Sequence, residues 1–455
     1  MPFQPDPTGA LTRHIATFAR RTTWQDIPDR VRHEAKRSLL NAIATAFAGS
    51  HEPAIDKSLA VLAPHSGAAT CTIIGRTERA DLLLAAYVNA MSANIFDYDD
   101  THPPTIIHPT APVSPALFAY AQANGCSGQD LLRAFIIGGE IECRLGNAVS
   151  PYHYARGWHI TSTCGVFGSA IAIGILAGLD ERRFIWAIGN AAAQAAGMVE
   201  TLGTMSKSIS VGNAARGGII AALLAAHDFD GPTAPLEGTH GFLPVYADEP
   251  RMSALTDELG ERWEIANNTY KPYPVGVVLN PVLEACLDLH ARFSLKPEDV
   301  ASIELTGHPL LRQRADRPDV STGRESQVSA QHAIAIALRR GRAGLAEFDD
   351  SAVAETARDG IRPAITFRDD ATCDIESARI VVHTRAGSTH AIDIKDTRGG
   401  ANNPLSDADI EAKLAELARY GRFGRDTTAI AEAIWHLDTA ARAGDVMQLC
   451  TPEDN

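Results

Sequence analysis

The chain has 455 residues, of which 45% are hydrophobic and 21% charged, and its formal net charge is −14. This length exceeds one ordinary domain, so we expect two domains in a globular protein. The acidic balance argues against nucleic-acid binding, which needs a basic surface. A local group of lysines and histidines can still bind an anion.

The sequence has the pattern of neither a signal peptide nor a membrane-spanning segment. Residues 1–24 lack the apolar core of a signal peptide, and the longest apolar run, residues 165–179, is too short and too rich in glycine and alanine to span a bilayer. The seven cysteines are scattered and form no CxxC pair, which is typical of reduced thiols. We therefore expect a cytoplasmic protein that does not bind membranes.

Residues 12–226 have a helical pattern almost throughout. The first predicted helix is amphipathic, whereas the last three consist mainly of alanine, glycine and isoleucine and should be buried on most faces. The predicted helices are residues 31–43, 82–96, 114–124, 129–149, 163–179, 186–200 and 213–227.

The pattern changes after about residue 264. Residues 270–274, Tyr-Lys-Pro-Tyr-Pro, cannot form a regular helix and predict a crossover between domains. An α+β domain follows over residues 268–403, after which a capping-box-like start at 404–409 predicts a helix that returns to the first domain. The α+β domain is predicted from strands at 300–306, 378–384 and 389–395, the last two joined by a turn at Gly387, and from a helix at 329–339.

The most unusual stretch is residues 97–110, where the apolar helix 82–96 ends in acids, histidines and prolines. The proline pair Pro103-Pro104 stops the helix, so the acids lie at its C-terminus, the unfavourable end of the helix dipole. Locally unfavourable choices are kept more often where function needs them. The alternative is a solvated turn rich in aspartate and proline.

Three further side chains are candidates for chemistry. His159 precedes a predicted buried helix, where a structural histidine is the alternative. Lys207 lies in the uncharged run 201–215, so it must either extend to solvent or meet an anion. Lys271 lies beside two prolines and Tyr273 at the crossover, where clefts form.

A metal centre at the acidic stretch is one possible interpretation. An Asp-rich helix end is also found in all-helical terpene synthases, but these need a second acidic motif and an aromatic pocket, and aromatic content here is only 6%. Phosphate-binding glycine loops and a GxSxG motif are absent from the sequence. The candidate ligands are Asp97, Asp99, Asp100, His102 and His108, and their spacing is not a convincing metal motif.

Together, these acids, histidines and lysines are better suited to acid–base chemistry on a small anion than to metal binding. Lysines neutralise carboxylates, and a histidine can remove a proton next to a carboxylate and return one to a leaving hydroxyl. Asp97 could orient a histidine or carry a proton itself.

These same stretches resemble the MmgE/PrpD family, which includes 2-methylcitrate dehydratases, cis-aconitate decarboxylases and iminodisuccinate epimerases. The resemblance extends from residues 35–40 to residues 403–407. It implies a mainly α protein: an all-helical domain from residues 1–267 and 404–455, with an inserted α+β lid domain, 268–403. It also implies a homodimer, a pocket between the domains, and neither metal nor organic cofactor. Its most specific motifs are residues 97–101 with 108–109, 157–163, 203–207 with 212–216, and 270–274.

The resemblance also assigns roles. His159 and His108 would be the acid and base, Lys207 and Lys271 would hold substrate carboxylates, and Asp97 and Thr101 would position substrate or histidine. Tyr273, next to Lys271, is a further substrate-binding candidate.

Two departures argue against cis-aconitate decarboxylation. Decarboxylase-like members carry a histidine where this chain has Gly276, and a lid tyrosine where it has Arg314. An arginine can bind a carboxylate through two hydrogen bonds but cannot protonate a carbanion at neutral pH. We therefore expect a lyase that removes a proton α to a carboxylate of a small di- or tricarboxylate. Among the candidate reactions we rank dehydration of the 2-methylcitrate type first, epimerisation of an imino- or aminodicarboxylate second and decarboxylation third. The non-enzymatic alternative is a carboxylate-binding homodimer.

Overall fold

The computed structural model describes residues 9–453 of the chain. The chain forms two compact units, one from Met1–Asn268 with Asp407–Asn455 and one from Thr269–Ser406. Helices dominate and the sheets are small, so the predicted mainly α class is confirmed.

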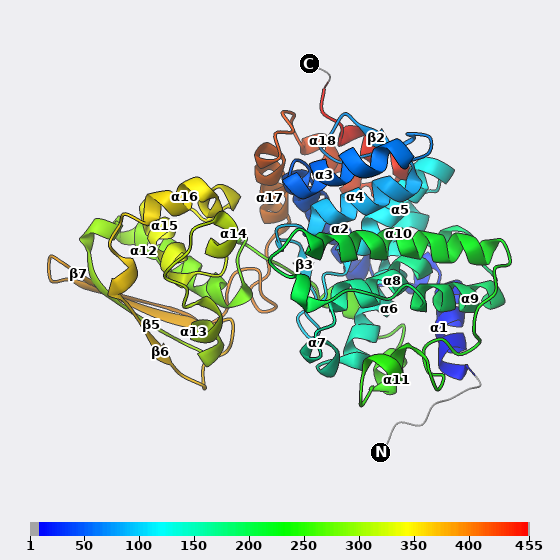
Figure 1. The fold of residues 1–455 in the computed structure, drawn as a ribbon, viewed down its shortest axis with the longest axis horizontal. Helices are drawn as coiled ribbons and strands as arrows, with labels where there is room; N and C mark the ends of the chain where they lie inside the picture. The colour runs from blue at the N-terminus through cyan, green and yellow to red at the C-terminus, as the bar shows by residue number, and fades with distance from the viewer. Residues whose placement is uncertain (1–8, 454–455) are drawn as a thin grey trace. The chain divides into compact units, whose positions relative to one another are not determined.

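The regular structure of the first unit is mainly helical (Figure 1), and within residues 9–268 and 407–453 it includes three strands of two residues each. Its strands are β1 (Cys71–Thr72), β2 (Arg79–Ala80) and β3 (Asp100–Thr101). Its helices are α1 (Ala10–Arg21), α2 (Asp29–Gly49), α3 (Pro53–Leu62), α4 (Leu82–Asn94), α5 (Thr110–Asn124), α6 (Gly128–Val149), α7 (Tyr152–Ala155), α8 (Ile160–Leu176), α9 (Glu181–Ala192), α10 (Ser206–Ala226), α11 (Phe242–Tyr246), α17 (Asp407–Tyr420), α18 (Thr428–Trp435) and α19 (Val446–Leu449).

Small residues let the central helices pack closely. A Cβ atom on Gly218 of α10 would lie 2.3 Å from the Ser169 side chain of α8, and one on Gly138 of α6 would lie 2.6 Å from the Gly168 carbonyl of α8. Such contacts are possible only where helix axes approach each other closely. Among the described residues, α10 is the one helix long and apolar enough to cross a membrane, and 56% of its apolar window is buried inside the protein.

Several helices differ from the predicted bounds, and two of these differences shape the site. The helix predicted over 186–200 is α9, which ends at Ala192. Beyond it Gly197 adopts φ 132°, and its carbonyl accepts a hydrogen bond from the His159 backbone N–H at 3.1 Å. The helix predicted to begin at 213 is α10, which begins at Ser206 and therefore has Lys207 in its first turn.

The C-terminal segment completes the first unit. Helix α17 packs on α2, where Arg37 forms an ion pair with Asp407. Lys36 of α2 donates to the Trp435 carbonyl at 2.7 Å and pairs with Asp438 at 2.6 Å.

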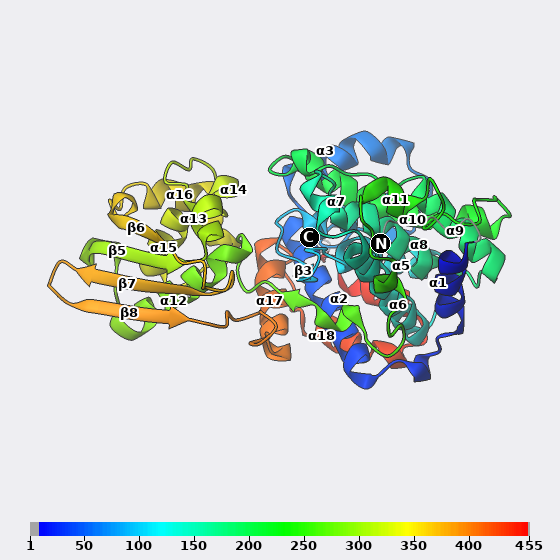
Figure 2. The same cartoon turned by 90° about the horizontal axis from the view of Figure 1, so that it is seen from below.

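The second unit holds a four-stranded sheet in the order β6-β5-β7-β8 with helices beside it (Figure 2). β5 is parallel to β6 and antiparallel to β7, which pairs antiparallel with β8. Buried residues alternate along β7, as expected for a sheet with one face on a core. The elements are β4 (Thr269–Tyr270), α12 (Asn280–Phe293), β5 (Val300–Gly307), α13 (Pro309–Ala315), α14 (Gly323–Ser326), α15 (Ala330–Arg340), α16 (Asp350–Thr356), β6 (Ile365–Asp369), β7 (Ala378–Thr384) and β8 (Thr389–Ile394).

Candidate active site

The candidate site is built on the loop between α4 and α5. The Asp81 side chain caps α4 by accepting from the Leu84 N–H at 2.8 Å, and the helix ends at Asn94, just before the acids. Two loop residues have positive φ, Asp97 at 55° and Ile106 at 57°. The second is unusual because a β-branched residue rarely adopts this conformation, and such strain persists where the surroundings fix it.

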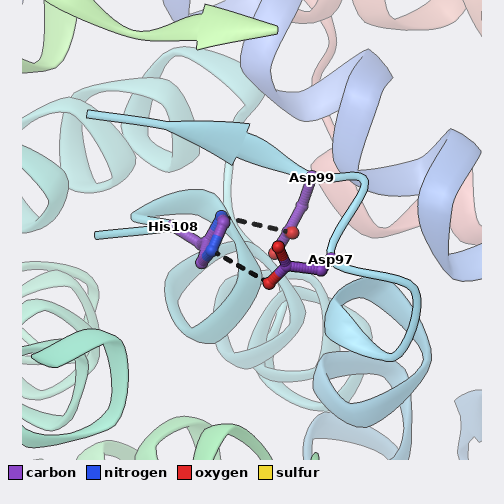
Figure 3. A group of neighbouring side chains, drawn as sticks. All are labelled: Asp97, Asp99 and His108. Atoms are coloured by element: carbon purple, nitrogen blue, oxygen red, sulfur yellow. Dashed lines mark ion pairs between the residues drawn. The ribbon is translucent and has the colours of Figure 1, made fainter. Parts of the chain in front are cut away.

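His108 lies between two carboxylates (Figure 3). Its Nδ1 is 2.7 Å from the Asp100 carbonyl oxygen, and because a carbonyl only accepts, Nδ1 carries a proton. The same nitrogen is 3.2 Å from Asp99 Oδ1, and Nε2 is 3.4 Å from Asp97 Oδ1. Negative groups on both sides of the ring favour the imidazolium form, which can donate a proton.

Lys207 meets an anion and does not extend to solvent. Its Nζ is 2.6 Å from Asp97 Oδ1 and donates to the Asn94 carbonyl at 3.3 Å. The lysine is 4% exposed, whereas about half of the Asp97 side chain is accessible. The accessible side of this ion pair is therefore the Asp97 carboxylate.

His159, the residue before α8, is held in one tautomer. Its Nδ1 lies 3.0 Å from Ser210 Oγ, and the Ser210 hydroxyl donates its single proton to the Lys207 carbonyl at 2.8 Å. Ser210 must then accept from Nδ1–H, so Nε2 carries the lone pair. Burial, reinforced by the nearby charges of Lys207 and His108, lowers the pKa of His159 to about 3. His159 is thus a neutral imidazole that can accept a proton at Nε2.

The neighbouring acids are held in place by hydrogen bonds from the surrounding helices and loop. Asn94 donates to Asp99 Oδ2 at 2.7 Å, and Asp100 Oδ2 accepts from Thr110 Oγ1 at 2.5 Å and from Asn268 Nδ2 at 2.7 Å. Burial raises the pKa of Asp100 to about 7.

Thr101 and His102 differ in their relation to His108. Thr101 Oγ1 is 3.4 Å from His108 Nδ1. The fully buried His102 points elsewhere: its Nδ1 is 2.8 Å from Thr105 Oγ1 and its Nε2 3.1 Å from Glu264 Oε2. Burial lowers the pKa of His102 to about 4. Of the two loop histidines, His108 is therefore the one in the cluster.

A metal ion could be held by Asp97, Asp99 and His108, whose ligand atoms lie within 4.8 Å of one another. The donor set does not fit this role well. The Lys207 ammonium already lies on the Asp97 carboxylate, and the Nδ1 of His108 that faces Asp99 is protonated. The arrangement favours an ion-pair cluster.

The remaining predicted residues belong to the second unit. Lys271 is partly buried after β4, and Arg314 is exposed on α13. Tyr273 is 8% exposed, and burial raises its pKa to about 12, so its phenol stays neutral. Their grouping with the cluster of the first unit stays a prediction.

Ser210 and Glu264 were missed by the sequence interpretation. Ser210 lies three residues after Lys207 on the same helix, a spacing that places two side chains on one face, and this signal could have indicated it. Glu264 has no comparable local signal, because its partner His102 is 162 residues away in sequence.

The fold and the cluster define a mainly helical protein with a buried lysine, two histidines and several carboxyl groups suited to proton transfer at an anion. Residues 13–254 match the MmgE/PrpD N-terminal domain, and residues 273–438 match the MmgE/PrpD C-terminal domain. The chain belongs to the MmgE/PrpD family.

Several curated relatives carry decarboxylase names. The chain is 26% identical to the cis-aconitate decarboxylase-like protein oryM of Aspergillus oryzae, over 98% of each chain. It is 30% identical to cis-aconitate decarboxylase of Aspergillus terreus, over 62% of this chain and 61% of the relative. It is 27% identical to the Homo sapiens cis-aconitate decarboxylase, over 89% and 87%. The family is thus one of lyase-type enzymes.

Proposed function

We propose that this chain is a cofactor-independent lyase that removes a proton α to a carboxylate of a small di- or tricarboxylate. The observation that carries the proposal is the neutral His159, whose Nε2 lone pair is set by Ser210 beside the Lys207 ammonium. An uncharged base next to a cation is what ionising a carbon acid requires, because the cation stabilises the charge that develops on the carboxylate.

Dehydration of a β-hydroxy acid uses the lysine and both histidines of the cluster. The substrate carboxylate binds the Lys207 ammonium, and His159 Nε2 takes the α-proton. As the Cα–H electrons form the double bond, the β-hydroxyl leaves with the proton of His108 as water. Afterwards His159 has gained one proton and His108 has lost one, so a proton returned through solvent restores both.

The low pKa of His159 in the free site suits this cycle. Burial and two neighbouring cations lower it, so the base is ready before substrate binds. A substrate carboxylate placed against Lys207 offsets that positive charge and raises the pKa of the histidine. The base therefore becomes stronger when substrate is present.

Decarboxylation is the second candidate, which the names of the relatives favour. In that reaction a carboxylate leaves as CO2 and the carbanion takes a proton from a cluster histidine. We rank decarboxylation behind dehydration because this chain has Gly276 where decarboxylase-like members carry a histidine. The backbone there is extended and a Cβ would meet only Val328 Cγ1, at 3.8 Å, so the missing side chain has no steric cause.

The proposal includes a cytoplasmic homodimer in which Thr101, Lys271, Tyr273 and Arg314 contact substrate. Large apolar side chains on the segment leading into α10 and in the first turn of that helix are exposed in the single chain, and such patches are common at protein interfaces. They are Met198, Leu202, Met205 and Ile209.

The test is incubation with a panel of hydroxy-di- and tricarboxylates and cis-aconitate in deuterated buffer, followed by NMR. Dehydration yields an alkene and water, whereas decarboxylation yields CO2. Deuterium incorporation with inversion would instead indicate an epimerase. His159→Gln and Lys207→Ala should each lower turnover at least ~10²-fold. Lys36→Ala is the matched control, because that lysine pairs with Asp438 away from the cluster. Binding without turnover across the panel would refute the enzyme proposal.

A further inference from the structure

Glu264 is a buried carboxylate that the proposed reaction does not use. It is 3% exposed and begins a short 3₁₀ helix, Glu264–Asn267. Its Oε2 faces His102 Nε2 at 3.1 Å, and its other oxygen is paired with Arg262. A carboxylate placed so deeply needs partners of this kind, but the histidine it meets belongs to the active-site loop.

His102 connects this carboxylate to the turn that ends at His108. The neutral ring donates from Nε2 to Glu264 and accepts at Nδ1 from the Thr105 hydroxyl, 2.8 Å away. The His102 N–H also donates to the Ile107 carbonyl at 2.8 Å, which closes the turn. The strained Ile106, with φ 57°, lies inside it.

The segment that carries Glu264 is itself fixed to the core helix α6. The fully buried Arg144 donates to the Asp257 and Arg262 carbonyls, both at 2.8 Å. Glu140, one turn earlier on α6, accepts from the Ile265 N–H at 3.0 Å. This attachment gives Glu264 a fixed position from which to hold the loop.

We propose that Glu264 is a positioning residue, which acts through His102 to hold His108 in the geometry that proton transfer needs. This inference rests on the proposed function, in which His108 delivers the proton to the leaving group. Glu264 does not touch substrate, so its loss should affect the chemical step and leave substrate binding by Lys207 unchanged.

The experiment measures kcat and KM for Glu264→Ala, Glu264→Gln and Thr105→Val. Glu264→Ala should lower kcat about 10- to 100-fold, the scale seen when supporting residues of a site are removed, with KM changed less than about 2-fold. Glu264→Gln should restore kcat to within about 3-fold, because its amide oxygen still accepts from His102. Thr105→Val, which keeps the side-chain shape, should lower kcat about 3-fold or more. Thr105→Val also decides the question if Glu264→Ala does not fold.

The control is Glu237→Ala. Glu237 is also fully buried, but it accepts hydrogen bonds from Thr12 in another part of the unit, so kcat per folded molecule should stay unchanged. In a His108→Ala background, Glu264→Ala should cost less than about 3-fold further, because residues acting through one group are not additive.

The outcomes separate the two proposals. If His108→Ala keeps full turnover, the proposed role of His108 is wrong. If His108→Ala lowers turnover but Glu264→Ala and Thr105→Val keep the wild-type kcat, only the positioning role of Glu264 is overturned. The positioning role would also be overturned if Glu264→Ala lowered kcat by the same factor in the wild-type and in the His108→Ala background, because general destabilisation gives that result.

Discussion

Replacing Ser210 with alanine tests whether the tautomer of His159 controls the rate. The substitution removes the acceptor that lies 3.0 Å from His159 Nδ1 and leaves the imidazole free to place its proton on Nε2, where it cannot act as a base. One such hydrogen bond contributes about 0.5–1.5 kcal/mol, which corresponds to about a 2- to 12-fold change in rate. We expect kcat to fall by this factor with KM nearly unchanged, because Lys207 keeps its contacts.

The assay is proton–deuterium exchange at the substrate α-carbon, measured by NMR at saturating substrate. Ser169→Ala is the matched control, because this buried serine of α8 donates to the Pro112 carbonyl at 3.1 Å and does not contact His159. A wild-type rate in Ser210→Ala, or the same loss in both variants, would refute the tautomer argument. A fall of more than about 100-fold would contradict it too, because a single neutral hydrogen bond is too weak for that effect.

Three further predictions concern stability and metal content. His102 and His153 have pKa values lowered to about 4 by burial, so each makes the unfolded chain bind more protons and lowers the free energy of unfolding as pH drops below about 6.5, whereas Asp100, with its pKa raised to about 7, acts in the opposite direction; urea titrations of the wild type and of His153→Gln at pH 5 and 7 would test the histidine contribution, and the same pH dependence in both proteins would contradict it. Gly168→Ala should destabilise by about 1–3 kcal/mol, because its Cβ would lie 2.6 Å from Glu142 Oε2; Gly276→Ala, which meets only an ordinary contact, is the control in thermal unfolding. Dialysis against EDTA should leave turnover unchanged, and activity that returns only with added Mg²⁺ or Zn²⁺ would refute the ion-pair interpretation of the cluster.

Much of the fold could be predicted from hydrophobic periodicity, since α6 has apolar residues at helical spacing and buried residues alternate along β7. Strand β6 was missed because it is only five residues long and fully buried at none of them. The end of α9 at Ala192 was missed because the local composition still favours a helix, whereas the residues beyond it lead to Gly197, whose carbonyl accepts a tertiary hydrogen bond from the His159 backbone N–H.

The site was predictable in its residue types and not in its geometry. The acids before a proline pair and the lone Lys207 marked the two segments that form the Asp97–Lys207 ion pair. Which loop histidine joins the cluster depends on a turn with Ile106 at positive φ, and nothing in the sequence predicts that conformation for isoleucine. The tautomer of His159 depends on Ser210, 51 residues away.

The packing of α17 on α2 has a consequence for biosynthesis. Helix α2 emerges early from the ribosome, but the surface that covers it is translated only after the whole of Thr269–Ser406. At about 5–20 residues per second, several hundred residues take on the order of a minute. During that time the side of α2 that packs on α17 is left without its final neighbour. A nascent chain that stalls before Asp407 should therefore be a target for chaperones, however well the inserted unit has folded.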